Sequence, residues 1–149
     1  MNSKHRYTMP QRNLLLLGAG LVILGSFLPW EQGGDFLAYW RHGIQFFPVF
    51  ADHGGVLVLL FGILILGLMF RSEGVVNDPA KWIFISAIAL CILSAYHIVG
   101  WLMRRIAANG IIGAPVIEVG LIMVAVGSIV LLVTTLAIKS KASANHVQK

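Results

Sequence analysis

The sequence predicts an all-α membrane protein in which four transmembrane helices form one bundle. Two observations predict it. Of the 149 residues, 58% are hydrophobic and only 11% are charged, which is more apolar than a soluble domain of this size can bury. The apolar residues also fall in four runs, each close to the ~20 residues that cross a hydrocarbon layer of ~30 Å. Backbone polar groups in that layer need partners within their own segment, so each run is expected to be a helix.

The four expected helices cover residues 14–30, 54–70, 82–103 and 114–138. The first follows a basic start, as in a signal peptide, but no small-x-small cleavage pattern follows it, so we interpret it as an uncleaved anchor. Residues 1–138 then form a single transmembrane domain, and residues 139–149 form a polar tail. The third helix carries the only cysteine, Cys91, which excludes membrane enzymes that depend on a cysteine pair.

Positive charge predicts the orientation of the bundle. One side of the membrane receives Lys4, Arg6, Arg12, Arg71, Lys81, Lys139, Lys141 and Lys149. The other side receives only Arg41, Arg104 and Arg105. By the positive-inside rule, both termini are expected in the cytoplasm, and the loop between the first two helices is expected outside. Because the basic residues lie at membrane edges, the net charge of +5 predicts no nucleic-acid partner.

Tryptophans mark the same two boundaries, because their amphipathic rings favour the headgroup level. Trp82 is the expected anchor at the inner interface, and Trp30, Trp40 and Trp101 are the expected anchors at the outer one.

The first outer loop predicts a short amphipathic helix lying in the membrane interface. Gly33 and Gly34 interrupt regular secondary structure. Asp35 is suited to cap the start of a short helix, and Pro48 ends that helix. The apolar side of this helix would consist of Phe36, Leu37, Trp40, Ile44 and Phe47. An apolar stripe of this kind is typical of segments that face lipid or the top of a bundle.

Small residues seven positions apart predict where the helices pack. The pairs are Gly18 and Gly25, Gly55 and Gly62, Ala87 and Ser94, and Gly120 and Gly127. Residues at this spacing lie on nearly the same face of a helix, with only ~20° of drift per heptad. Small side chains let two backbones approach closely, and this contact replaces the hydrophobic driving force that lipid removes. We therefore expect a tight, left-handed bundle.

Ionisable residues near the outer boundary are the candidates for chemistry. Imidazole and carboxylate groups that bind zinc or iron are present at Glu31, His42, Asp52, His53, His97 and Glu118. His53 and His97 are the pair that the topology places at similar depth, as axial haem ligands require. No close motif joins these residues, so haem and metal are alternatives and no cofactor is predicted.

Structural roles are favoured for three of these residues. Asp52 lies near the start of the second helix, where the helix dipole stabilises a negative charge. Glu118 lies near the start of the fourth and can pair with Arg104 or Arg105 across the short connection. His97 is expected to form a hydrogen bond at the outer boundary. No acidic residue falls at mid-membrane, which disfavours proton-coupled export, and no phosphate loop or nucleophile elbow indicates an enzyme.

The segments GSFLPW, at the end of the first helix, and DHGGVLVLLFG, at the start of the second, resemble those of a loose group of small bacterial four-helix membrane proteins of unassigned function. In that pattern Pro-Trp ends the first helix and an Asp-Gly-like turn begins the second, matched here by Pro29, Trp30, Asp52 and Gly54. His53 interrupts the Asp-Gly pair, and the resemblance covers the first half of the chain. It implies the architecture and a bacterial plasma membrane, and no activity.

The expected function is that of a non-catalytic integral membrane protein, acting as a homo-oligomer or as an accessory or assembly subunit of a larger membrane complex. Its expected partners are the lipid bilayer and other membrane subunits or copies of itself. Two alternatives stay open: a redox protein associated with quinone, haem or metal, and a small channel.

Overall fold

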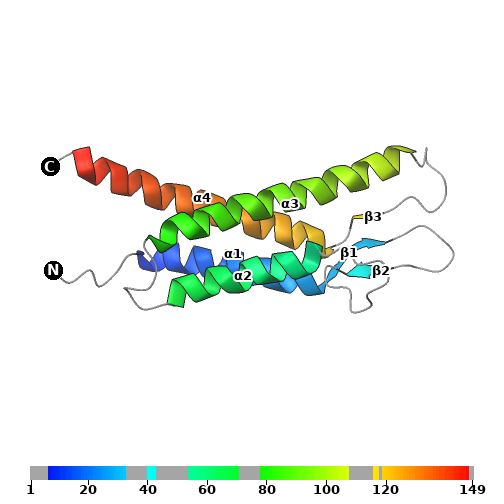
Figure 1. Cartoon of the computed structure of the whole chain (residues 1–149), viewed down its shortest axis with the longest axis horizontal. Helices are drawn as coiled ribbons and strands as arrows, with labels where there is room; N and C mark the ends of the chain where they lie inside the picture. The colour runs from blue at the N-terminus through cyan, green and yellow to red at the C-terminus, as the bar shows by residue number, and fades with distance from the viewer. Residues whose placement is uncertain are drawn as a thin grey trace.

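The computed structural model describes residues 7–32, 40–42, 54–70, 78–107, 116–117 and 119–147. Within them lie four helices: α1 (Met9–Phe27), α2 (Gly54–Phe70), α3 (Pro79–Ala107) and α4 (Val119–Val147). The expectation of four helices is confirmed. Successive helices run in opposite directions, so the N-terminus and the C-terminus lie at the same end of the molecule (Figure 1). We name this end, where α1 begins and α4 finishes, the terminal end.

Three short strands among the described residues add to the expected all-α fold. They are β1 (Pro29–Gln32), β2 (Trp40–His42) and β3 (Val116–Ile117), and they form an antiparallel sheet in the order β2-β1-β3. The sheet lies opposite the termini, and we name its location the sheet end (Figure 1). Because β1 pairs with β3, the chain leaving α1 is tied to the chain entering α4.

The first helix ends three residues earlier than the sequence predicted, and proline explains the difference. The ring of Pro29 disfavours helical backbone at the residue before it. Leu28 is accordingly extended, with φ −86° and ψ 159°, and α1 ends at Phe27. At its other end α1 begins at Met9, where the Thr8 amide donates a hydrogen bond to the side-chain oxygen of Gln11 at 3.0 Å.

The fourth helix also differs from its predicted bounds, 114–138. Residues 116–117 pair with β1 as a strand, which removes the first part of the expected helix. At the other end α4 continues to Val147, so most of the expected polar tail is helical. The third helix is longer than expected at both ends, and α2 has the predicted bounds.

The amphipathic helix expected in the first outer loop is wrong at its centre. Trp40–His42 is extended and pairs with β1 in the register Pro29↔His42, Glu31↔Arg41 and Gln32↔Trp40. The backbone groups of this segment are therefore paired with another strand, and they are not available for helical hydrogen bonds. The remaining residues of the expected helix, including Phe36, Ile44 and Phe47, lie outside the described residues.

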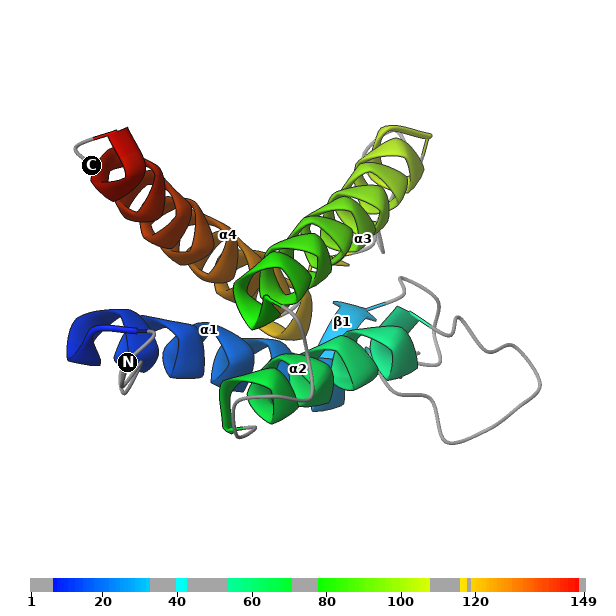
Figure 2. The same cartoon turned by 60° about the vertical axis from the view of Figure 1, so that its left-hand side comes forward.

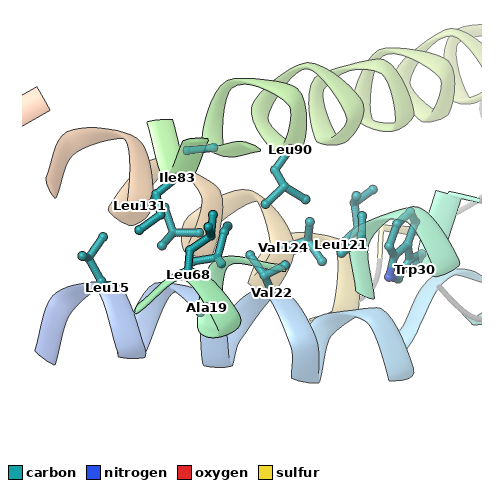
Figure 3. Packing of buried hydrophobic residues seen from close by; sticks show 13 residues of the cluster. Leu15, Ala19, Val22, Trp30, Leu68, Ile83, Leu90, Leu121, Val124 and Leu131 are labelled. Carbon is teal, nitrogen blue, oxygen red and sulfur yellow. The ribbon is translucent and has the colours of Figure 1, made fainter. Parts of the chain in front are cut away.

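Each helix packs against two others. α1 packs on α4 and α2, and α3 packs on α4 and α2, with the most extensive contact between α1 and α4. Figure 2 shows α3 and α4 crossing above α1 and α2, with their far ends leading away from the bundle. Figure 3 shows the side chains that fill the centre: Leu15, Ala19 and Val22 of α1, Leu68 of α2, Ile83 and Leu90 of α3, and Leu121, Val124 and Leu131 of α4.

Two of the described helices are long and apolar enough to cross a membrane, by length and composition: Pro79–Met103 in α3 and Val119–Ser140 in α4. Only 28% and 39% of their most apolar stretches are buried, whereas the core helix of a soluble protein is mostly buried. The apolar part of α2, Gly55–Phe70, is shorter.

Candidate functional site

At the sheet end Trp30 contacts one of the residues proposed for chemistry, His97, and also the end of α1. Its indole N–H donates a hydrogen bond to the carbonyl oxygen of Gly25 at 2.8 Å. In a continuing helix that oxygen would accept from the residue four positions later, but residue 29 is a proline and has no N–H. Trp30 thus supplies the missing donor and caps the end of α1.

Trp30 also contacts α3. Its ring centroid lies 4.9 Å from that of His97, with an interplanar angle of 79°, and His97 lies edge-on to Tyr96 at 5.5 Å. The Trp30 side chain is only 6% exposed. The ring is packed between the end of α1 and α3, and its expected place at the headgroup level stays a prediction. Edge-to-face pairs contribute ~0.5–1.5 kcal/mol beyond their area, so the contact helps to hold the two helices together.

Three of the candidate metal ligands lie at the sheet end within the described residues. Glu31 is in β1, His42 is in β2 and His97 is in α3. The register places Glu31 opposite Arg41 on one side and opposite Ile117 on the other. Asp52, His53 and Glu118 lie outside the described residues. Among the residues that the structure describes, no group of three or more His, Cys, Asp or Glu is arranged to hold a metal ion.

The eight small residues singled out for helix packing are all buried: Gly18, Gly25, Gly55, Gly62, Ala87, Ser94, Gly120 and Gly127. Four of them belong to the contact between α1 and α4. A Cβ atom added to Gly18 would lie 3.0 Å from the carbonyl oxygen of Gly127, and one added to Gly25 would lie 2.7 Å from that of Gly120. The two heptad pairs therefore face each other in antiparallel order, backbone against backbone.

Five of the six buried serine and threonine hydroxyls in the described bundle donate to their own helices. The Ser26 hydroxyl donates to the carbonyl of Ile23 at 2.6 Å, and the Thr135 hydroxyl donates to that of Leu131 at 2.8 Å. The same pattern holds for Ser94, Ser128 and Thr134. Such hydroxyls have donated their hydrogen to the backbone and offer little to a solute. Sequence reasoning singled out only Ser94 among them, although serine and threonine in an apolar run were the available signal.

Basic side chains lie against aromatic rings at both ends of the bundle. At the terminal end the Arg12 guanidinium lies 5.6 Å from the centre of the Phe70 ring, and the Lys139 ammonium lies 3.9 Å from that of Phe84. At the sheet end Arg105 lies 5.5 Å from the Trp101 ring. The expected inner anchor, Trp82, is 48% exposed in the first turn of α3, and Trp101 is half-buried. Trp40 is in β2.

The outer surface of the bundle is apolar on all four helices. Large exposed hydrophobic side chains include Leu14, Leu17 and Leu24 of α1, Leu57, Leu60 and Ile63 of α2, Ile92, Val99 and Met103 of α3, and Ile122, Ile129 and Val133 of α4. Several are more than half exposed, with Ile92 at 65%. A monomeric soluble protein rarely exposes one contiguous apolar patch larger than a few hundred Å², and here the apolar side chains surround the bundle.

No protein-family model matches the chain, and no curated protein or solved structure matches it either. The resemblance of its first half to small bacterial four-helix membrane proteins therefore stays a prediction. The proposed function therefore rests on the burial, charge and contacts of the described residues.

Proposed function

We propose that the chain is a non-catalytic integral membrane protein whose four helices cross a bacterial plasma membrane, with both termini in the cytoplasm. It acts by association, either with copies of itself or as an accessory subunit of a larger membrane complex. The observation that carries this proposal is the apolar surface around all four helices. In water that surface would drive aggregation. Lipid chains and the apolar helices of other subunits can cover it.

Charge along the helices supports the proposal. α3 has no Asp, Glu, Lys or Arg between Lys81 and Arg104, a stretch of ~33 Å at 1.5 Å per residue, which matches the hydrocarbon thickness. α2 has none at all over ~25 Å. α1 is uncharged from Asn13 onward for ~22 Å, and Arg12 at its start is exposed, so its long side chain can extend to the interface.

The packing of the bundle favours a role in association over transport or chemistry. The close α1–α4 contact and the hydroxyls bonded to their own helices leave a centre filled with aliphatic side chains (Figure 3). Five of the six buried serine and threonine hydroxyls in the described core are hydrogen-bonded to backbone, which leaves few polar groups to line a path for ions. The surfaces open to a partner are therefore the outer faces of the helices.

Extraction and mass measurement test the proposal together. We expect the full chain to stay in membranes washed at pH 11, and native mass spectrometry in mild detergent to show a multimer or a complex with other subunits. A colourless preparation is expected as well. Release at pH 11 would contradict the membrane assignment, and a lone monomer carrying a haem spectrum or stoichiometric metal would support the redox alternative in its place.

Orientation has its own test, because Cys91 is the only cysteine. In a Cys91→Ser background, single cysteines are introduced at Ser3 before α1 and at Ser143 near the end of α4. We expect a membrane-impermeant maleimide to label neither position in intact cells and both after permeabilisation. Labelling of either position in intact cells would contradict cytoplasmic termini.

A further inference from the structure

Two lysines from different helices lie on one edge of the bundle at the terminal end. The Lys139 ammonium of α4 lies 3.9 Å from the centre of the Phe84 ring of α3. Lys81 lies one turn before Phe84, and residues three apart are neighbours on a helix surface. The contact therefore brings Lys139 to the edge of the bundle that carries Lys81.

The same contact aligns the ends of the two long apolar segments. One segment begins at Pro79 and the other ends at Ser140. Because Lys139 lies against Phe84, the end of one segment is level with the beginning of the other. At this level the surface changes from apolar to basic. In a chain that spans the bilayer, phospholipid headgroups lie at such a boundary.

Neither ammonium group forms an ion pair within the described part of the chain. The nearby carboxylate, Asp78, accepts the backbone N–H of Lys81 at 3.3 Å and so caps the start of α3. Lys81 is exposed and Lys139 is half-buried. A pair of like charges in this position is complementary to an anion supplied from outside the protein.

Exposed apolar side chains continue from the lysines toward the middle of the bundle. Below Lys81 on the same face of α3 lie Ile85, Ile88 and Ile92, all exposed. Residues at these spacings form a continuous stripe along a helix. On α4 the exposed Leu136 lies one turn before Lys139. A free inorganic anion would contact only the two lysines, whereas a molecule with an anionic head and a hydrocarbon chain fits both parts of this edge.

We propose that Lys81 and Lys139 bind the phosphate headgroup of an anionic phospholipid, whose hydrocarbon lies along Ile85, Ile88 and Ile92. The proposal rests on the proposed insertion of the chain in a membrane and names a lipid partner for it. Each basic residue near a membrane surface contributes enough attraction that we expect the two lysines together to favour an anionic lipid by roughly 10- to 30-fold.

Native mass spectrometry of the full chain in detergent, with added phosphatidylglycerol or phosphatidylcholine of identical acyl chains, tests this proposal. We expect the wild-type protein to retain phosphatidylglycerol roughly 10- to 30-fold better. The variant Lys81→Gln/Lys139→Gln is expected to retain the two lipids almost equally. Lys81→Arg/Lys139→Arg keeps both charges and is expected to keep the preference.

Arg105→Gln is the matched control, because it removes a basic residue that also lies against an aromatic ring, at the opposite end. It is expected to leave the preference unchanged. Equal retention of both lipids by the wild-type protein, or an unchanged preference in the double glutamine variant, would overturn the proposal. Displacement of the lipid by an equal concentration of glycerol phosphate would overturn it in favour of a free-anion site.

Failure of this proposal and failure of the proposed function are distinguishable. A protein that stays in membranes at pH 11 but shows no lipid preference contradicts only the lipid site. A protein that is released at pH 11 contradicts the membrane assignment, and the lipid site with it.

Discussion

Gly18 of α1 and Gly127 of α4 face each other so closely that a Cβ atom on Gly127 would lie 2.8 Å from the carbonyl oxygen of Gly18. Real Cβ atoms essentially never come that close to a neighbouring atom. The two backbones are therefore in contact, with no side chain between them. In lipid, where burial of apolar surface gives no driving force, this close approach stabilises the helix pair through van der Waals contact.

Replacing Gly18 by alanine is expected to destabilise the protein by about 1–3 kcal/mol, because the new methyl group would meet Leu131 at 2.8 Å and backbone at 3.0 Å. The measurement is unfolding in a titration with sodium dodecyl sulfate, followed by helical circular dichroism.

Gly20 is the matched control for that substitution, because it lies in the same helix and a Cβ there meets nothing within 4 Å. Gly20→Ala is expected to be neutral or stabilising by up to about 1 kcal/mol through helix propensity. Equal effects of the two substitutions would contradict the close α1–α4 contact.

Substitutions at Trp30 separate its two contacts. Trp30→Phe keeps a ring beside His97 but leaves the carbonyl of Gly25 without its donor, which is expected to cost about 1–3 kcal/mol. Trp30→Ala loses both contacts and is expected to cost about 3–5 kcal/mol. The same denaturant titration measures both, and the result would speak against the capping role if Trp30→Phe were as stable as the wild type.

Thr135→Val is expected to change stability by less than about 1 kcal/mol. The Thr135 hydroxyl is buried, but it donates to the carbonyl of Leu131 in its own helix, so its removal breaks no contact between helices. Valine has nearly the same shape and fills the same space. A loss of several kcal/mol would instead indicate that the hydroxyl has a role between helices. Val124→Thr, which adds a hydroxyl in the core where Thr135→Val removes one, is the reverse substitution.

Charge exchange tests the register of the sheet. Glu31 and Arg41 are directly opposite in β1 and β2, and opposite charges in such positions contribute about 0.2–1 kcal/mol. Glu31→Arg is expected to destabilise the sheet end, and Glu31→Arg/Arg41→Glu to restore it in part. Protection of the β1 amides from hydrogen exchange is the measurement. Additive effects of the two substitutions would contradict this pairing.

The sequence predicts the helices well because their signal is local. The uncharged run 54–70 is α2, with the same bounds. The heptad spacing identified eight small residues, and all eight are buried. The register between helices is not local. Nothing in the sequence says that Gly18 faces Gly127, since that depends on how two helices far apart in the chain slide against each other.

The sheet was missed for a related reason. Its strands have only two to four residues, and β1 pairs with residues more than eighty positions away, as at Gln32 and Val116. The apolar residues around Trp40 recur at helical spacing, but pairing with β1 decides the backbone there. The Lys139–Phe84 contact was missed because it too depends on the register of two helices.

The pairing of α1 with α4 has a consequence for how the chain folds during synthesis. α1 has its most extensive contact with α4, which is made later, so the face of α1 that carries Gly18 and Gly25 has no permanent neighbour until α4 has been made. During that interval α1 is an open half of an interface. The α1–α4 interface can therefore form only once α4 has been made, and a chain that stops before α4 exposes a surface shaped for a glycine-rich helix.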